Sequence, residues 1–177
     1  MKKFLLATVF VLIAYPTLAQ SAAEKTGVNS ALGIAPKTQD FVTQVAQSDM
    51  LEIETSKLAL ANGNPTIKSF ADQMVRDHTK TSAELKALLG DNKIAITLPT
   101  ALDKAHQDKL DKLKKLQGTD FVKEYKSMQV SAHKDAVSLF ERYAQGGENS
   151  QLKAWAAKTL PALQHHLQMA QELEKKS

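Results

Sequence analysis

The stretch NPTIKSFADQMVRDHTKTSAELKALLG, residues 64–90, decides the fold class. Asn64 is a favourable helix cap, and Pro65 suits the first helical position, where its missing N–H would have no partner anyway. The following positions share one helix face because they recur at alternating steps of four and three residues, the spacing of helices that pack in bundles. These positions are Ile67, Ala71, Met74, His78, Thr81, Leu85 and Leu88. Gly90 is expected to end the helix.

The same periodicity predicts three more long helices around this one. They run from about Gln39 to Asn62, from about Thr119 to Gly146 and from Asn149 or Ser150 to the C-terminal region. Short connections join the first helix to the second and the third to the fourth, so each of these pairs should be antiparallel. The sequence therefore predicts an all-α fold, an up-and-down four-helix bundle over residues 38–175. Pro161 should kink the last helix.

A shorter helix is expected between the second and third long ones. Thr100 followed by Asp103 resembles a capping box, which marks a helix start. Four leucines then form a narrow apolar stripe among Lys and Asp residues: Leu102, Leu110, Leu113 and Leu116. This stripe either docks onto the bundle or forms a contact surface for a partner helix or a membrane.

The first 19 residues are typical of a secretory signal peptide. Lys2 and Lys3 precede an uncharged run that Pro16 breaks, and cleavage is predicted after Ala19. The apolar run is about a dozen residues, shorter than the roughly 20 that span a bilayer, so no stable membrane anchor is expected after cleavage. Residues 20–37 are small and polar and predict a flexible leader. The mature protein is expected in the periplasm or outside the cell.

Composition excludes several classes of function. The chain has no Cys, which excludes disulfides and thiol catalysis. The formal net charge is +4, and loss of Lys2 and Lys3 gives 4 − 2, or about +2. Arg occurs only at Arg76 and Arg142, and acidic residues are interspersed among the lysines. A nucleic-acid partner is not expected because such proteins carry clustered basic faces.

Four polar residues interrupt the inward faces of the long helices, one on each. Glu52 lies seven residues from both Val45 and Ala59, so it points to the same side as they do. The same reasoning turns three histidines inward, near the middle of their helices: His78, His133 and His166. One carboxylate and three imidazoles could meet in the bundle centre.

Such a set predicts a site for one divalent metal ion, with zinc, iron and copper all compatible with the ligands Glu52, His78, His133 and His166. A hydrogen-bonded Glu–His network without metal is the alternative. Asp77 is adjacent to His78 and is therefore turned about 100° away from it on the helix. We expect its carboxylate to be solvated or to support a ligand, and not to bind the metal itself. His106 and His165 are expected on the surface.

Several of these stretches together resemble a known family. They are Glu52-Ile53-Glu54, Met74-Val75-Arg76-Asp77-His78-Thr79, residues 121–133, and Leu160-Pro161-Ala162-Leu163-Gln164-His165-His166-Leu167. Over about residues 38–174 the chain resembles the exported bacterial family called domain of unknown function 4142, a ferritin-like set. The resemblance implies a ferritin-like four-helix bundle.

The resemblance does not imply di-iron chemistry. Ferritin-like di-iron sites use a Glu from each of two helices and a Glu-x-x-His from each of the others. Here Val75 and Leu163 stand three residues before His78 and His166. With one inward carboxylate, a two-metal centre lacks its bridging ligands.

Three functions are therefore compatible with the sequence. The first is a non-enzymatic envelope or stress-related protein that binds a metal ion or small ligand at the Glu/His cluster. The second is a metal-dependent redox enzyme at the same site. The third is a metal-free interaction module that uses the stripe from Leu102 to Leu116. The protein partner of such a module is not specified by the sequence.

Overall fold

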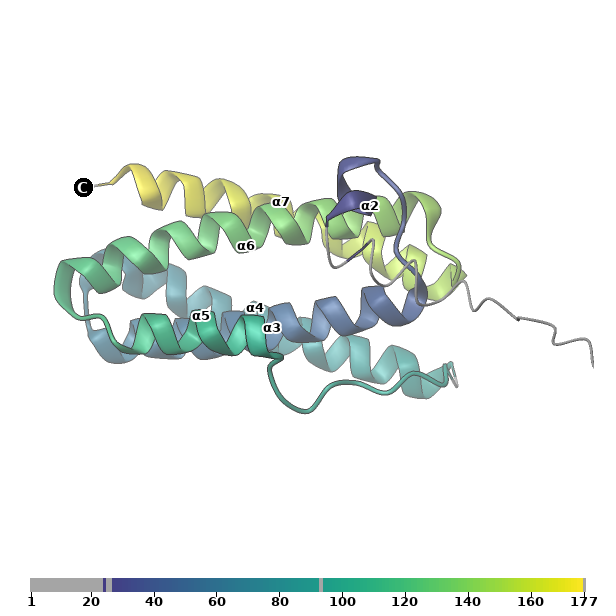
Figure 1. Ribbon diagram of the computed structural model, residues 1–177, viewed down its shortest axis with the longest axis horizontal. Helices are drawn as coiled ribbons and strands as arrows, with labels where there is room; N and C mark the ends of the chain where they lie inside the picture. Colours follow the sequence, from purple (N-terminus) through teal and green to yellow (C-terminus); the bar gives the residue numbers. More distant parts are fainter. Residues whose placement is uncertain (1–23, 25–26, 93, 177) are drawn as a thin grey trace, which may run out of the picture.

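A computed structural model describes residue 24, residues 27–92 and residues 94–176 (Figure 1). The predicted signal peptide lies outside the described residues. The described chain forms six helices and no strand, so the all-α prediction is confirmed for it. Four of the helices are long and form a helical bundle.

The first long pair is a helical hairpin, α3 (Thr38–Asn62) and α4 (Pro65–Asp91). Gly63 adopts a φ of 75°, a left-handed conformation that glycine accepts without strain, and this ends α3. The Asn64 side chain then accepts a hydrogen bond from the Thr66 N–H at 2.9 Å. The predicted cap and its following Pro65 therefore start α4 as expected.

The second hairpin joins α6 (Gly118–Gly146) to α7 (Ser150–Lys175). Asn149 caps α7 by accepting hydrogen bonds from the backbone N–H groups of Gln151 and Leu152, at 3.1 and 3.0 Å. The helix α7 continues through Pro161.

Around the bundle, α3 lies between α4 and α6, and α7 also contacts both α4 and α6. The connection after α4 returns along the bundle before α6 begins, so α4 and α6 run in the same direction (Figure 1). Neighbouring helices are consequently antiparallel on all four sides. An up-and-down bundle reverses direction at every successive long helix. Here the direction reverses within each hairpin, but α4 and α6, which follow one another along the chain, are parallel (Figure 1).

The returning connection contains α5 (Lys104–Lys114), which packs on α3 and α6. Asp103, and not Thr100, caps this helix: its carboxylate accepts from the His106 N–H at 2.9 Å. Leu110 and Leu113 are buried against the bundle, and Leu102 and Leu116 are half-buried. The leucine stripe thus packs against the bundle of its own chain. The interaction-module hypothesis required an exposed stripe, and the burial of these leucines does not support it.

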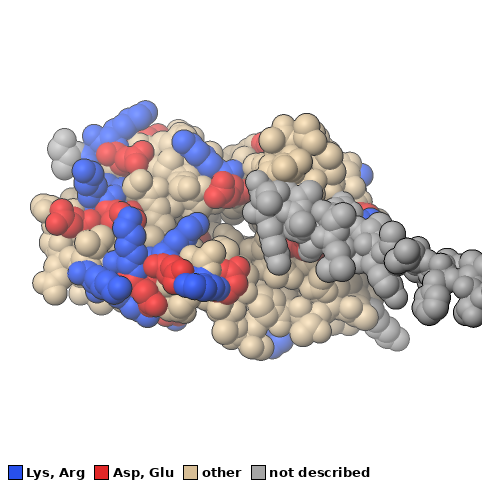
Figure 2. Space-filling model, in the orientation of Figure 1, with Lys and Arg blue, Asp and Glu red and all other residues tan. Residues whose placement is uncertain are grey.

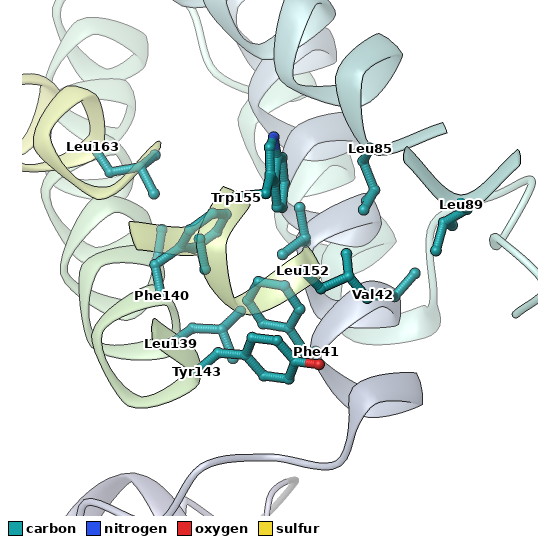
Figure 3. Close-up of a cluster of buried hydrophobic side chains, with 13 residues drawn as sticks. Phe41, Val42, Leu85, Leu89, Leu139, Phe140, Tyr143, Leu152, Trp155 and Leu163 are labelled. Carbon is teal, nitrogen blue, oxygen red and sulfur yellow. The ribbon is translucent and has the colours of Figure 1, made fainter. Parts of the chain in front are cut away.

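The bundle interior consists of two apolar clusters with a polar layer between them. One cluster, shown in Figure 3, contains Phe41, Phe140 and Trp155 with Leu85 and its neighbours. The other is built from the opposite ends of the same four helices, together with Leu113 of α5. Its members on the long helices are Ala59 from α3; Ile67, Phe70, Ala71 and Met74 from α4; Phe121, Tyr125, Met128 and Val130 from α6; and Ala170 and Leu173 from α7. Each long helix therefore passes from one cluster to the other through a short central segment.

Part of the predicted leader lies against the bundle. A short helix, α2 (Val28–Ala31), contacts α6. The Arg142 guanidinium on α6 pairs with Glu24 at 2.8 Å and donates to the Ile34 carbonyl at 2.7 Å. Both charged side chains of this pair are buried.

On the left part of the face in Figure 2, Lys and Arg side chains are interspersed with Asp and Glu. Among the described residues, we find no helix with the length and apolar character needed to span a bilayer.

Replacing Leu113 with Ala tests the docking of α5. Because Leu113 is 0% exposed, the substitution should lower the free energy of unfolding by about 2 to 5 kcal/mol. Lys109→Ala, at an exposed position of the same helix, is the control and should change it by less than about 0.5 kcal/mol. Urea unfolding followed by circular dichroism measures both. Equal and small losses of unfolding free energy in Leu113→Ala and Lys109→Ala would show that α5 is not part of the packed core.

Candidate metal centre

The central segment of each long helix contributes one of the predicted ligand residues to the polar region between the two apolar clusters. Glu52 on α3 is 1% exposed, His78 on α4 2%, His133 on α6 1% and His166 on α7 4%. On every helix the polar residue falls between members of the two clusters, for example between Met74 and Leu85 on α4. The four residues singled out by the sequence pattern are therefore all buried between the two apolar clusters.

The three imidazoles converge. One ring nitrogen from each of His78, His133 and His166 lies within 4.8 Å of the others. The ring centroids are 5.5 to 5.6 Å apart in all three pairs. The carboxylate of Glu52 lies outside this group of mutually close ligand atoms.

Each ring is held by a hydrogen bond through its other nitrogen. His78 donates from Nδ1 to Asp49 at 2.7 Å, and His133 donates from Nδ1 to the backbone carbonyl of Gln129 at 2.8 Å. His166 donates from Nε2 to Asp77 at 2.9 Å. These acceptors fix which nitrogen carries the proton, as the supporting partners of metal-binding histidines do.

The opposite nitrogens have no protein partner. They are Nε2 of His78, Nε2 of His133 and Nδ1 of His166, and all three are buried. Buried polar atoms in proteins nearly always have a hydrogen-bond partner, so three unpartnered nitrogens at one point are unusual. Because each ring donates on its far side, the nitrogens facing the centre carry lone pairs and can act as ligands.

Asp49 supports the ring of His78, a role that the sequence pattern did not predict. Its carboxylate is buried and also accepts a hydrogen bond from the Ser82 hydroxyl at 3.0 Å. The spacing does indicate that Asp49 faces inward, because it lies four residues after Val45 and three before Glu52 on the same helix face. Asp77 has the supporting role that the sequence allowed, although it serves His166 on the neighbouring helix and not the adjacent His78.

The remaining histidines lie apart from the centre. His165 is exposed. His106 is partly exposed and donates from Nδ1 to Asp103, the cap of its own helix, at 2.8 Å.

Burial sets the protonation of the cluster. It lowers the pKa of His166 to about 4, with the neighbouring His133 and His78 adding to the effect. Burial likewise lowers the pKa of His133. For His78, burial opposes protonation, but the hydrogen bond and charge of Asp49 prevail and raise its pKa. Two of the three rings are thus held neutral, the form that binds metals.

The family model described as "Domain of unknown function (DUF4142)" matches residues 23–173. The chain belongs to this family. The match includes α3, α4, α6 and all but the last two residues of α7, with the three converging histidines and their supporting carboxylates. No significant match was found among curated proteins or among solved structures.

The arrangement supplies three imidazole nitrogens from three different helices of this family domain. Imidazole nitrogens suit zinc, copper and iron(II). In a tetrahedral zinc site with bonds of about 2.0 to 2.1 Å, ligand nitrogens lie about 3.3 Å apart. The observed separations of up to 4.8 Å require only a small inward movement of the rings.

Acid should destabilise the metal-free protein through His166. Its folded-state pKa of about 4 is below its ordinary value of 6.5, so between these pH values the unfolded chain binds a proton that the folded chain excludes. The free energy of unfolding should therefore fall as the pH drops from 6.5 to about 4. His166→Gln should show a shallower fall. Urea titrations with a chelator at several pH values measure this.

The neighbouring His165 is a matched control for that experiment. Because it is exposed, His165→Gln should retain the wild-type dependence on pH. Identical pH profiles for wild type and His166→Gln would contradict the electrostatic description of the cluster.

Proposed function

We propose that this chain is an exported, non-enzymatic protein that binds one divalent transition-metal ion through His78, His133 and His166. Glu52 supplies the adjacent negative charge. One observation carries the proposal: the three rings each bring a ligand atom within 4.8 Å of the others, and each ring has one hydrogen-bonded nitrogen and one that is buried without a partner. A metal-free network would be expected to pair these nitrogens with one another or with Glu52.

The surrounding structure supports binding in preference to catalysis. The cluster lies between two apolar layers, so an ion held there would be enclosed by protein along the bundle axis. Zinc, copper(II) and iron(II) all fit three imidazoles, and the borderline nitrogen ligands disfavour magnesium and calcium, which take oxygen. Three histidines and one nearby carboxylate support a one-metal site and not a carboxylate-bridged pair.

For the fold, we propose the ferritin-like type of four-helix bundle. Two antiparallel hairpins joined by one long connection are characteristic of that type, and here the long connection carries α5. Sites in such bundles are built from side chains of facing helices, as the histidine cluster is. For location, we propose export to the periplasm or the medium after cleavage behind Ala19, on the strength of Lys2, Lys3 and the apolar run that follows.

Added metal should stabilise the folded protein because the unfolded chain has no preformed site. At free zinc about 100-fold above the dissociation constant, the melting temperature should rise by roughly 5 to 10 °C. His78→Ala and His166→Ala should each remove most of this shift, and chelator should reverse it. Differential scanning calorimetry of the chelator-treated protein, with zinc and with copper, measures the effect.

The controls for this experiment are His165→Ala and His106→Ala, which lie outside the cluster and should keep the full shift. A shift that survives both His78→Ala and His166→Ala would place the ion elsewhere. A melting temperature unaffected by metal in wild type would make the cluster structural.

Asp49 should govern metal affinity without touching the ion. Asp49→Asn weakens the acceptor for His78 Nδ1 and allows the ring to reorient, so metal affinity should fall about 10- to 100-fold. Asp72→Asn is the control, because Asp72 is an exposed residue of α4 that pairs with Arg76. Competition titration against a chromophoric chelator gives both values. Equal metal affinities of wild type and Asp49→Asn would show that His78 does not need Asp49 in order to bind the metal.

A further inference from the structure

Within the polar region between the two apolar clusters, a second layer lies next to the histidine cluster. It contains Glu52, 1% exposed, and Gln129 on α6, 0% exposed. Both carboxylate oxygens of Glu52 and both amide atoms of Gln129 lack a hydrogen-bond partner. Four unpartnered side-chain atoms from two residues point to a ligand that is not part of the protein.

The helix register places these two residues opposite each other. The hydroxyls of Ser56 on α3 and Tyr125 on α6 are 2.9 Å apart, which places these two residues against each other across the two antiparallel helices. Glu52 lies one turn before Ser56, and Gln129 lies one turn after Tyr125. Because the two helices are antiparallel, Glu52 and Gln129 are displaced from the Ser56–Tyr125 contact by the same distance and in the same direction along the bundle axis. Electrostatics agree: burial raises the pKa of Tyr125 and Glu52 adds to it, so the carboxylate is near this face of α6.

This layer borders the metal ligands. Gln129 is one turn before His133, and its backbone carbonyl holds the ring of that residue. The Glu52 charge acts on both His78 and His133. Yet the Glu52 oxygens are not among the ligand atoms that lie within 4.8 Å of one another. A four-coordinate ion held by the three imidazoles alone would have one position left for a ligand from outside this group.

We propose that this position takes a small neutral ligand with an O–H or N–H group, water being the smallest, which donates a hydrogen bond to Glu52 beside the Gln129 amide. The inference rests on the proposed metal site. A carboxylate accepts hydrogen bonds and repels negative charge, and in a buried site that repulsion is only weakly screened. The subsite therefore selects protic neutral ligands and rejects anions.

Cobalt(II) and azide test this selection. Cobalt(II) reports its coordination through its visible spectrum, and azide is a small anion without a proton. Wild type loaded with cobalt should bind azide weakly. Glu52→Gln, which keeps the shape and removes the charge, should still bind cobalt and should bind azide at least about tenfold more tightly. Adding Gln129→Leu to Glu52→Gln should lower azide affinity again, because the amide donor is lost.

Ser56→Ala is the matched control, since Ser56 lies one turn farther from the histidines on the same helix face. It should bind cobalt and azide as wild type does. Equal azide affinities in wild type and Glu52→Gln would overturn the inference. Loss of cobalt binding in Glu52→Gln alone would also overturn it, by making Glu52 a direct ligand, and would leave the proposed metal site intact. Failure of wild type to bind cobalt would contradict both proposals.

Discussion

The structure depends on how three buried imidazoles satisfy their hydrogen-bonding groups. Each ring has two nitrogens, and the protein provides an acceptor for only one of them: Asp49 for His78, the Gln129 carbonyl for His133 and Asp77 for His166. Leaving the other nitrogen buried without a partner is unfavourable by about 1 to 3 kcal/mol per group. Three such groups at one point are consistent with a fold that reaches its full stability with an ion bound.

The rest of the bundle holds this layer in place. Apolar clusters lie on both sides, and Figure 3 shows one of them, where Phe41, Phe140 and Trp155 pack together. The two hairpins are aligned by their turns, at Gly63 and at Asn149, so the middle of each long helix reaches the same level. An added or deleted residue in a helix would rotate its inward side chain by about 100° and remove it from the centre.

Periodicity explains what the sequence could predict. A residue three, four or seven positions from apolar residues of one helix face lies on that face, which identified Glu52 and the three histidines and gave the all-α fold. Periodicity does not give the distance between helices. It therefore placed Glu52 with the histidines, whereas the structure puts its carboxylate outside the closest group. It also did not reveal that Asp49 and Asp77 each support a ring on another helix, because such contacts depend on helix pairing.

The most direct test of the central claim is X-ray absorption spectroscopy of the protein loaded with one equivalent of zinc. The outer-shell scattering of imidazole rings counts the histidines bound to the ion. We expect three imidazoles and one light-atom ligand, at zinc–nitrogen distances of about 2.0 to 2.1 Å. One imidazole or none, with oxygen ligands filling the shell, would place zinc on the surface and contradict a metal centre at His78, His133 and His166.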